Sequence, residues 1–274
     1  MYSGSIIRQK SGRVIGAHQK IDRVARRRLA EIMPSNRFFP DIKDILHFEG
    51  LNGPDGIKRK SPSKDEPWHY IDPTDDKDIA LIGLIEDHIV NLTNALYEKN
   101  ETRAAFESAW LAHAIVDGLT PAHHYPLSEK IEELWGHPKE HRTSVRSKNI
   151  IPADTRREQV SKNWEYWGAK GVFTSHVLFE FGVATTISGL RFKGLVPNNN
   201  QLVRLKKEGQ TPIFKEAVWK VYELDMYNEF QRNGWNRNLA RVTRTKLAPI
   251  IINSVVLAWY YASERAEQRR KAKR

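Results

Sequence analysis

The stretch Trp110-Leu-Ala-His113-Ala-Ile-Val-Asp117-Gly-Leu-Thr-Pro121-Ala-His123 carries the most informative pattern in this sequence. His113 and Asp117 are four residues apart, so a helix presents both on one face. Pro121 ends that helix because proline cannot continue its hydrogen bonding, and His123 follows two residues later. A second pair with the same spacing, His176 and Glu180, occurs farther along the chain. Paired histidines and carboxylates on two helices indicate a metal site between them.

Helical periodicity dominates the rest of the chain. Few segments alternate with the period of two that is typical of strands, whereas several place apolar residues at helical spacing. We therefore predict an all-α fold, a single-domain multi-helix bundle. The expected helices cover residues 17–33, 77–99, 101–119, 128–135, 155–187, 213–232 and 236–266, and Pro34, Pro121 and Pro212 mark limits between them.

Two long loops are also expected. Residues 47–73 are rich in Gly, Pro and charge and include Asp55 and His69, so this loop should wrap over the metal centre. Residues 188–212 contain Asn198-Asn-Asn200 and several Lys and Arg. This second loop is either a surface excursion or a flap that contacts substrate.

Composition limits the ligand chemistry and the partners. The 274 residues include no cysteine, so a zinc ion must be held by His, Asp and Glu, which suits a catalytic site better than a structural one. The net charge is +11 and the sequence pI is about 9.7. Such a basic protein favours polyanionic partners, namely nucleic acid, phosphorylated metabolites or an anionic lipid surface.

The ends of the chain set the expected domain division. Residues 1–13 are interpreted as an N-terminal extension, 14–266 as the metal-binding domain and 267–274 as a basic C-terminal tail that offers peripheral contact to an anionic membrane. The first ten residues have no apolar signal-peptide core, and the apolar stretch 247–262 is too short to span a membrane. We expect a cytoplasmic protein, with nonclassical export left open, and no obligate protein partner.

Each candidate ligand also has an ordinary structural interpretation. A single His-x-x-x-Asp or His-x-x-x-Glu pair is usually a surface pair or a satisfied hydrogen bond in the core. Asp55 stands in Asn52-Gly-Pro-Asp-Gly56, a natural turn, and His18 begins a basic helix where surface histidines are common. The metal-site prediction therefore depends on the order of all these residues together.

That order resembles the zinc-dependent phospholipase C and P1 nuclease superfamily. The resemblance covers residues 14–182: Asp55 in a Gly-rich loop, Trp68-His69-Tyr70, the element His113-x-x-x-Asp117-x-x-x-Pro121-x-His123, and His176-x-x-x-Glu180. Glu180 stands where P1-type nucleases tend to have Asp, which favours the phospholipase C branch.

The resemblance implies an all-α fold with a polynuclear zinc cluster, of three ions, in a cleft. By motif, one zinc would be held by Asp55, His69 and His113, with Asp117 bridging to another. A more exposed zinc would be held by His123, His176 and Glu180. His18, which matches an early histidine of the family, would bind the third zinc together with Asp117.

The sequence departs from the family at the third zinc. Secreted members bind that ion through the amine and carbonyl of a mature amino-terminal Trp, and no Trp precedes Trp68 here. The third site is then incomplete, or water or another group fills it, or the chain is trimmed near Arg13. We expect two or three zinc ions, with weaker occupancy of the third.

The implied function is hydrolysis of a phosphate ester by zinc-activated hydroxide. The first hypothesis is a phospholipase C-like phosphodiesterase acting on a phospholipid or related ester, with Asp55 as ligand and catalytic base. A P1-type nuclease or nucleotidase and a noncatalytic, zinc-stabilised binding protein are the alternatives. Residues that flank the ligands are candidates for substrate contact, or else pack around them: Trp68, Tyr70, His124 and Tyr125.

Overall fold

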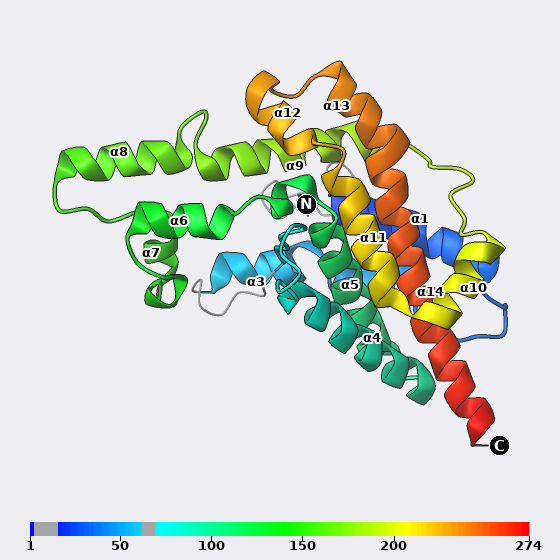
Figure 1. Ribbon diagram of the computed structural model, residues 1–274. Helices are drawn as coiled ribbons and strands as arrows, with labels where there is room; N and C mark the ends of the chain where they lie inside the picture. Colours follow the sequence, from blue (N-terminus) through cyan, green and yellow to red (C-terminus); the bar gives the residue numbers. More distant parts are fainter. Residues whose placement is uncertain (3–15, 62–68, 274) are drawn as a thin grey trace.

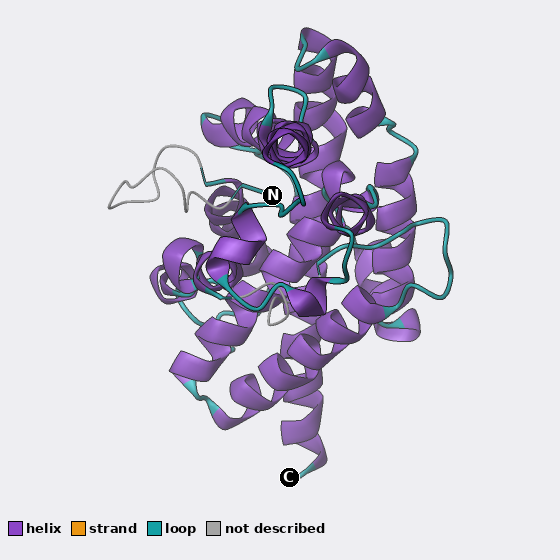
Figure 2. Ribbon diagram, turned by 90° about the vertical axis from the view of Figure 1, so that its left-hand side faces the viewer, coloured by secondary structure: helices purple, strands orange, loops and turns teal. Residues whose placement is uncertain are grey.

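A computed structural model describes residues 1–2, 16–61 and 69–273, and the elements it assigns there are all helical (Figures 1 and 2). The all-α, single-domain prediction is confirmed. In chain order the elements are α1 (Ala17–Ile32), α2 (Ile42–His47), η1 (Gly50–Asn52), α3 (Pro54–Lys60), α4 (Ala80–Glu98), α5 (Glu101–Gly118), η3 (Pro121–His124), α6 (Leu127–Trp135), η4 (Lys139–His141), α7 (Val145–Asn149), α8 (Arg156–Trp167), α9 (Val172–Ser188), α10 (Asn199–Glu208), α11 (Gln210–Tyr222), α12 (Met226–Asn233), α13 (Arg237–Val242), the π-helical turn η5 (Thr243–Leu247) and α14 (Ala248–Ala272).

The long helix α14 lies at the centre of the bundle and packs against α1, α4, α5 and α11 (Figure 1). Its apolar first half is the expected core helix, and Trp259 on it is fully buried. The indole Nε1 of Trp259 donates to the backbone oxygen of Ser108 at 3.0 Å and so joins α14 to α5. No helix among the described residues combines the length and the apolar character that crossing a membrane requires.

Helix α5 carries the central ligand pair and is fixed at both ends. The Asn100 side chain accepts from the backbone NH of Arg103 at 3.0 Å and caps the first turn. At the other end, a Cβ on Gly118 would lie only 2.6 Å from Leu81 and 2.8 Å from Phe214. Only glycine lets α4 and α11 pack so closely beside the last turn of α5, directly after Asp117.

Helices α6, α7 and α8 project from the bundle (Figure 1). This region, called the arm below, covers residues 127–167 and has a small core of its own, which includes Leu127, Ile131 and Tyr166. Asn163 on α8 ties the arm together, because its side chain accepts from Ile151 N at 3.1 Å and donates to Ile151 O at 2.8 Å.

Three of the expected helices are interrupted. The segment 155–187 divides into α8 and α9 at residues 168–171, where a Cβ on Gly171 would lie 2.5 Å from the Tyr166 carbonyl oxygen. The segment 213–232 divides at residues 223–225, where Asp225 adopts a left-handed φ of 49°. The segment 236–266 contains the π-helical turn η5 between α13 and α14. Apolar residues recur on both sides of each break, so the sequence pattern alone suggested continuous helices where the backbone is interrupted.

The loop prediction for 188–212 is partly wrong, because α10 occupies residues 199–208. Asn198 Oδ1 accepts from Gln201 N, and Gln201 Oε1 accepts from Asn198 N, each at 3.0 Å. This reciprocal capping starts a helix that buries Leu205. In the loop expected at 47–73, η1 and α3 form, and residues 62–68 lie outside the described part of the chain.

The basic C-terminal segment continues α14 instead of forming a separate tail. Arg270 donates to the backbone oxygens of Leu96 and Tyr97 at the end of α4. The Arg269 guanidinium lies 4.7 Å from the ring centre of Tyr97. These contacts hold residues 269 and 270 against the bundle.

Candidate metal centre

The structure brings the sequence-predicted ligands together in one buried cluster, which we call the His/carboxylate cluster: His18, Asp55, His69, His113, Asp117, His123, His176 and Glu180. His18 comes from the first turn of α1, Asp55 from α3 and His69 from the segment before α4. The other ligands come from α5, η3 and α9. Asp55 is the most exposed of the eight, with 26% of its side chain accessible, whereas the side chain of Asp117 is 1% accessible.

Asp117 lies at the centre and its two oxygens face different partners. Oδ2 lies 2.8 Å from His69 Nδ1 and 3.3 Å from His113 Nε2. Oδ1 lies 3.2 Å from His18 Nε2 and contacts the α-amino group of Met1. A carboxylate with donors on both sides has the geometry that bridging two cations requires.

His123, His176 and Glu180 form the second part of the cluster. Oε1 of Glu180 lies 3.0 Å from Nε2 of both histidines. The orientation of the His123 ring is fixed on the side away from Glu180, because its Nδ1 pairs with the backbone oxygen of His69 at 2.8 Å. One face of α9 supplies the His176–Glu180 pair, as the four-residue spacing predicts.

Three groups of potential metal-binding atoms follow, each with its atoms within 4.8 Å of one another: His18, Asp55 and His113; His69, His113 and Asp117; and His123, His176 and Glu180. The last group is the set that the resemblance implies. The first two distribute Asp55, His69 and His18 differently from the implied sets, with His113 shared between them.

His18 shows that the cluster suits cations. Its ring is fully buried and stacks on the His113 ring with 3.8 Å between centres. Nδ1 has no hydrogen-bond partner among the described residues, and the 3.2 Å contact of Nε2 with Asp117 Oδ1 lacks hydrogen-bond geometry. Buried polar atoms are nearly always satisfied in native proteins. A metal ion beside Nε2 would provide the missing partner.

The carboxylates are held in their charged form. Burial alone would raise the pKa of Asp117, but the Met1 ammonium and the nearby His123 and His113 outweigh it and hold that pKa well below its usual range. At Glu180, burial also raises the pKa, but the Met1 ammonium and His176 outweigh it and hold that pKa below its usual range. Anionic oxygens in a buried site attract cations strongly.

Two histidines are poised to act as neutral ligands. Burial, together with the nearby Lys58 charge, lowers the pKa of His69 to about 3 against the opposing effect of Asp117. Burial likewise lowers the pKa of His123. His113 differs, because the Asp117 and Glu49 carboxylates outweigh its burial and raise its pKa. A cation that binds His113 must therefore displace a proton.

Two cationic groups of the chain already lie among the ligands. The Met1 amine, 3.1 Å from Glu180 Oε1, has a pKa of about 10, because Asp117 and Glu180 outweigh its burial. Lys58 Nζ lies 3.4 Å from His69 Nδ1 and 3.6 Å from Asp55 Oδ1. Both supply positive charge to a site with three carboxylates, as bound metal ions would.

Met1 bears on the expected N-terminal extension and on the third site. Met1 and Tyr2 are buried, and Tyr2 O accepts from Ala17 N at 2.7 Å. The Met1 amine contacts the same Asp117 oxygen that faces His18. The contact places a positively charged group of the chain beside Asp117, on the side that faces His18. Nothing in the sequence pattern around Met1 indicated this.

Glu49 is a second residue that the sequence did not reveal. It is buried, and its carboxylate lies 3.3 Å from His113 Nδ1, on the side of the ring away from Asp117. A carboxylate behind a metal-binding histidine fixes the ring orientation and raises its basicity. Glu49 follows Phe48 with no motif, so only its position in the fold identifies it.

The flanking aromatic residues have different positions. The ring of Tyr70 stacks on that of His123 with 4.7 Å between centres, and burial raises the pKa of its hydroxyl, so the hydroxyl stays protonated. Trp68 lies outside the described residues. His124 and Tyr125 line a separate cavity of about 290 Å³ beside α11 and α12, and His124 Nε2 donates to Gly118 O.

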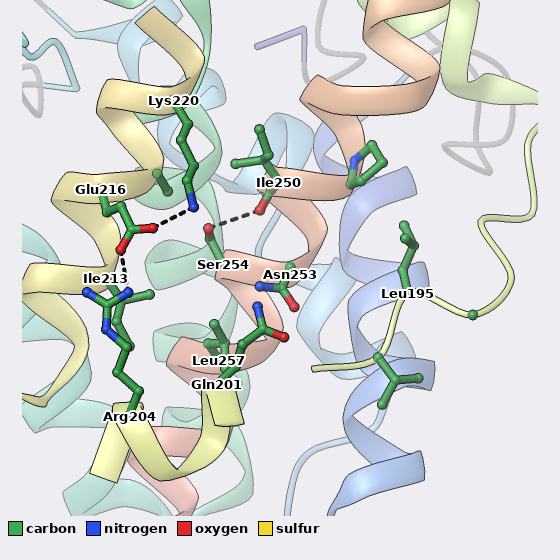
Figure 3. A pocket seen from close by; sticks show the side chains of 14 residues that line it. Leu195, Gln201, Arg204, Ile213, Glu216, Lys220, Ile250, Asn253, Ser254 and Leu257 are labelled. Carbon is green, nitrogen blue, oxygen red and sulfur yellow. Dashed lines mark hydrogen bonds and ion pairs between the residues drawn. The ribbon is translucent and has the colours of Figure 1, made fainter. Parts of the chain in front are cut away.

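Another cavity, of about 350 Å³, lies between α10, α11 and α14 (Figure 3). None of the eight cluster residues lines it. Glu216 bridges Arg204 and Lys220 on one wall, and Ser254 donates to Ile250 O on another (Figure 3). Its charged groups are thus paired with one another.

Comparisons of the chain with family models, with curated proteins and with solved structures returned no match.

Proposed function

We propose that this protein is a zinc-dependent phosphoesterase with phospholipase C-like activity, which hydrolyses a phospholipid or a related phosphodiester. One observation carries the proposal: candidate ligands spread from residue 18 to residue 180 meet in one cluster of three donor groups, two of which share His113. The order of these ligands is the one that resembles the zinc-dependent phospholipase C and P1 nuclease superfamily. Nitrogen and carboxylate oxygen without thiolate are the donors expected at a catalytic zinc site.

The buried and the partly exposed residues of the cluster have different proposed roles. His69, His113, Asp117, His123, His176, Glu180 and His18 are buried and would hold the ions. Zinc ions, when bound, lower the pKa of water to give a nucleophile near neutral pH and offset charge on the phosphoryl oxygens. Asp55 borders the partly exposed side of the cluster, where a substrate phosphate can approach.

Asp55 is assigned to orient the attacking water and accept its proton. Burial would raise its pKa, but His113 and Lys58 outweigh burial and hold the carboxyl below its ordinary pKa, so it is ionised at neutral pH. As the water oxygen bonds to phosphorus, the phosphorus bond to the leaving oxygen breaks. Tyr70, which keeps its proton beside His123, can donate a hydrogen bond to a bound phosphate oxygen.

A P1-type nuclease is the second candidate, and the net charge of +11 favours it. Binding to a polynucleotide depends on neutralising phosphates and is therefore strong for basic proteins. Glu180, together with the Trp68-His69-Tyr70 sequence, favours the phospholipase instead.

The test is a metal count combined with two activity assays on one chelator-washed preparation reconstituted with zinc. We expect two or three zinc ions per chain and hydrolysis of short-chain phosphatidylcholine. Hydrolysis of single-stranded DNA without that of the lipid would replace the first candidate with the second. A folded protein that takes up no zinc and cleaves neither substrate would overturn both and favour a noncatalytic binding protein.

A further inference from the structure

We infer that the outer face of the arm is a docking surface for an anionic lipid bilayer. Val160 and Trp164 on α8 are 71% and 72% exposed, and Trp167, one turn farther, is 43% exposed. Their spacing of four and three residues places them on one side of the helix. Large apolar side chains that form a contiguous exposed face mark an interaction site.

The arm presents this face from a defined structure. Away from this face of α8, Tyr166 is 4% exposed and packs on Phe173. Beside the face, one turn before Trp167, Asn163 pairs with the backbone of Ile151. Trp167 Nε1 donates to Asn149 O at 2.9 Å, so α7 lies beside the exposed face. Ile150, which follows Asn149, is itself 42% exposed. The exposed residues thus belong to two elements held together.

The charge around this face is complementary to an anionic surface. Residues 145–171 contain six Lys and Arg and only three Asp and Glu. Arg156 and Arg157 at the start of α8 and Lys170 just after it are exposed. Tryptophan prefers the interface between lipid headgroups and acyl chains, and adjacent cations add attraction to anionic headgroups.

The position of the arm links the surface to the cluster. Four residues after α8, the chain enters α9, which carries His176 and Glu180. Leu178, between these ligands, points outward and is 48% exposed. A bilayer on the arm would give the phosphoesterase a source of substrate, and in this respect the inference rests on the proposed function.

The experiment is cosedimentation with vesicles of phosphatidylcholine, with and without phosphatidylglycerol, using the zinc-loaded full chain. We expect binding to the anionic vesicles that weakens with added salt. The double variant V160S/W164S should bind about tenfold more weakly, because it loses two apolar anchors. W219S is the matched control, since Trp219 is a 47% exposed tryptophan on α11, outside the arm; its binding should match that of the original chain.

Equal vesicle binding by the original chain and V160S/W164S, or none by either, would overturn the inference. A double variant that loses affinity for a single-stranded oligonucleotide, while vesicle binding is unchanged, would assign the face to nucleic acid instead, because bases also stack on exposed tryptophan.

Hydrolysis of a water-soluble phosphodiester separates this inference from the proposed function. The double variant should retain this activity. Vesicle binding by a chain with no hydrolytic activity would overturn the proposed function and support the docking surface. Hydrolysis without vesicle binding would support the proposed function and overturn the docking surface.

Discussion

Polar side chains are usually exposed and apolar ones buried, and the consecutive helices α8 and α9 each depart from one half of this rule. Helix α9 buries His176 and Glu180, which are polar, whereas α8 exposes Val160 and Trp164, which are apolar. Burying charged groups costs free energy unless they are paired, and exposed apolar surface is unfavourable in water. The buried polar face of α9 is already paired, since Glu180 contacts His123 and the Met1 amine, and it would also suit a cation. The exposed face of α8 would be stabilised by an apolar or amphipathic surface.

The largest expected effect tests the buried side of this comparison. Asp117→Ala removes the carboxylate whose oxygens face His69, His113 and His18, so zinc binding and hydrolysis should both be lost. Metal content after dialysis and turnover measure this. Asp87→Ala, at an exposed carboxylate of α4, is the control and should leave both unchanged. Full zinc content in Asp117→Ala would refute a bridging role.

Asp55→Asn should separate catalysis from metal binding. The amide cannot take a proton from water, so the turnover rate should fall by about 10²- to 10⁴-fold, the range for loss of general base catalysis. Substrate affinity should change much less. Steady-state kinetics on a short-chain phosphodiester provide the measurement, and a rate equal to that of the original chain would remove Asp55 from the mechanism.

Glu49→Gln tests whether the carboxylate behind His113 supports the cluster. Zinc affinity should weaken by about 10- to 100-fold, as is typical when such a partner is lost. Competition with a chelator measures it. Glu107→Gln is a matched control, since Glu107 is equally buried and pairs with His88 at 2.6 Å away from the cluster. Equal affinities in both variants would show that Glu49 acts only in packing.

The smallest effect tests the exposed side. Trp164→Ala should change the free energy of unfolding by no more than about 0.5 kcal/mol, as is usual for exposed positions. Tyr166→Ala, two residues away, removes a buried aromatic ring from the core of the arm and should cost about 3 kcal/mol. Urea denaturation compares them. A large loss in Trp164→Ala would mean that this face is already packed within the folded chain.

Most of the cluster could be predicted from the sequence because its ligands lie in fixed local spacings. His113 with Asp117 and His176 with Glu180 each occupy one helical face, and a helix fixes that geometry whatever surrounds it. The breaks between α8 and α9 and between α11 and α12 were missed, because apolar residues recur on both sides of each. The capping pair Asn198 and Gln201 was readable in principle, yet the polar composition of the segment favoured a loop.

The sequence by itself determined the helical class and the pairs His113–Asp117 and His176–Glu180, since these follow from residue type and from spacing within one helix. His18, Asp55 and His69 were expected from the family resemblance of the whole ligand order. The tertiary structure alone decided that Met1, Glu49 and Lys58 join the cluster, and that Val160 and Trp164 remain outside the core. Contacts between residues far apart in the chain depend on how helices pack, and no local spacing records that packing. The same limit applies to exposure, because an apolar helical face looks the same in the sequence whether or not another element covers it.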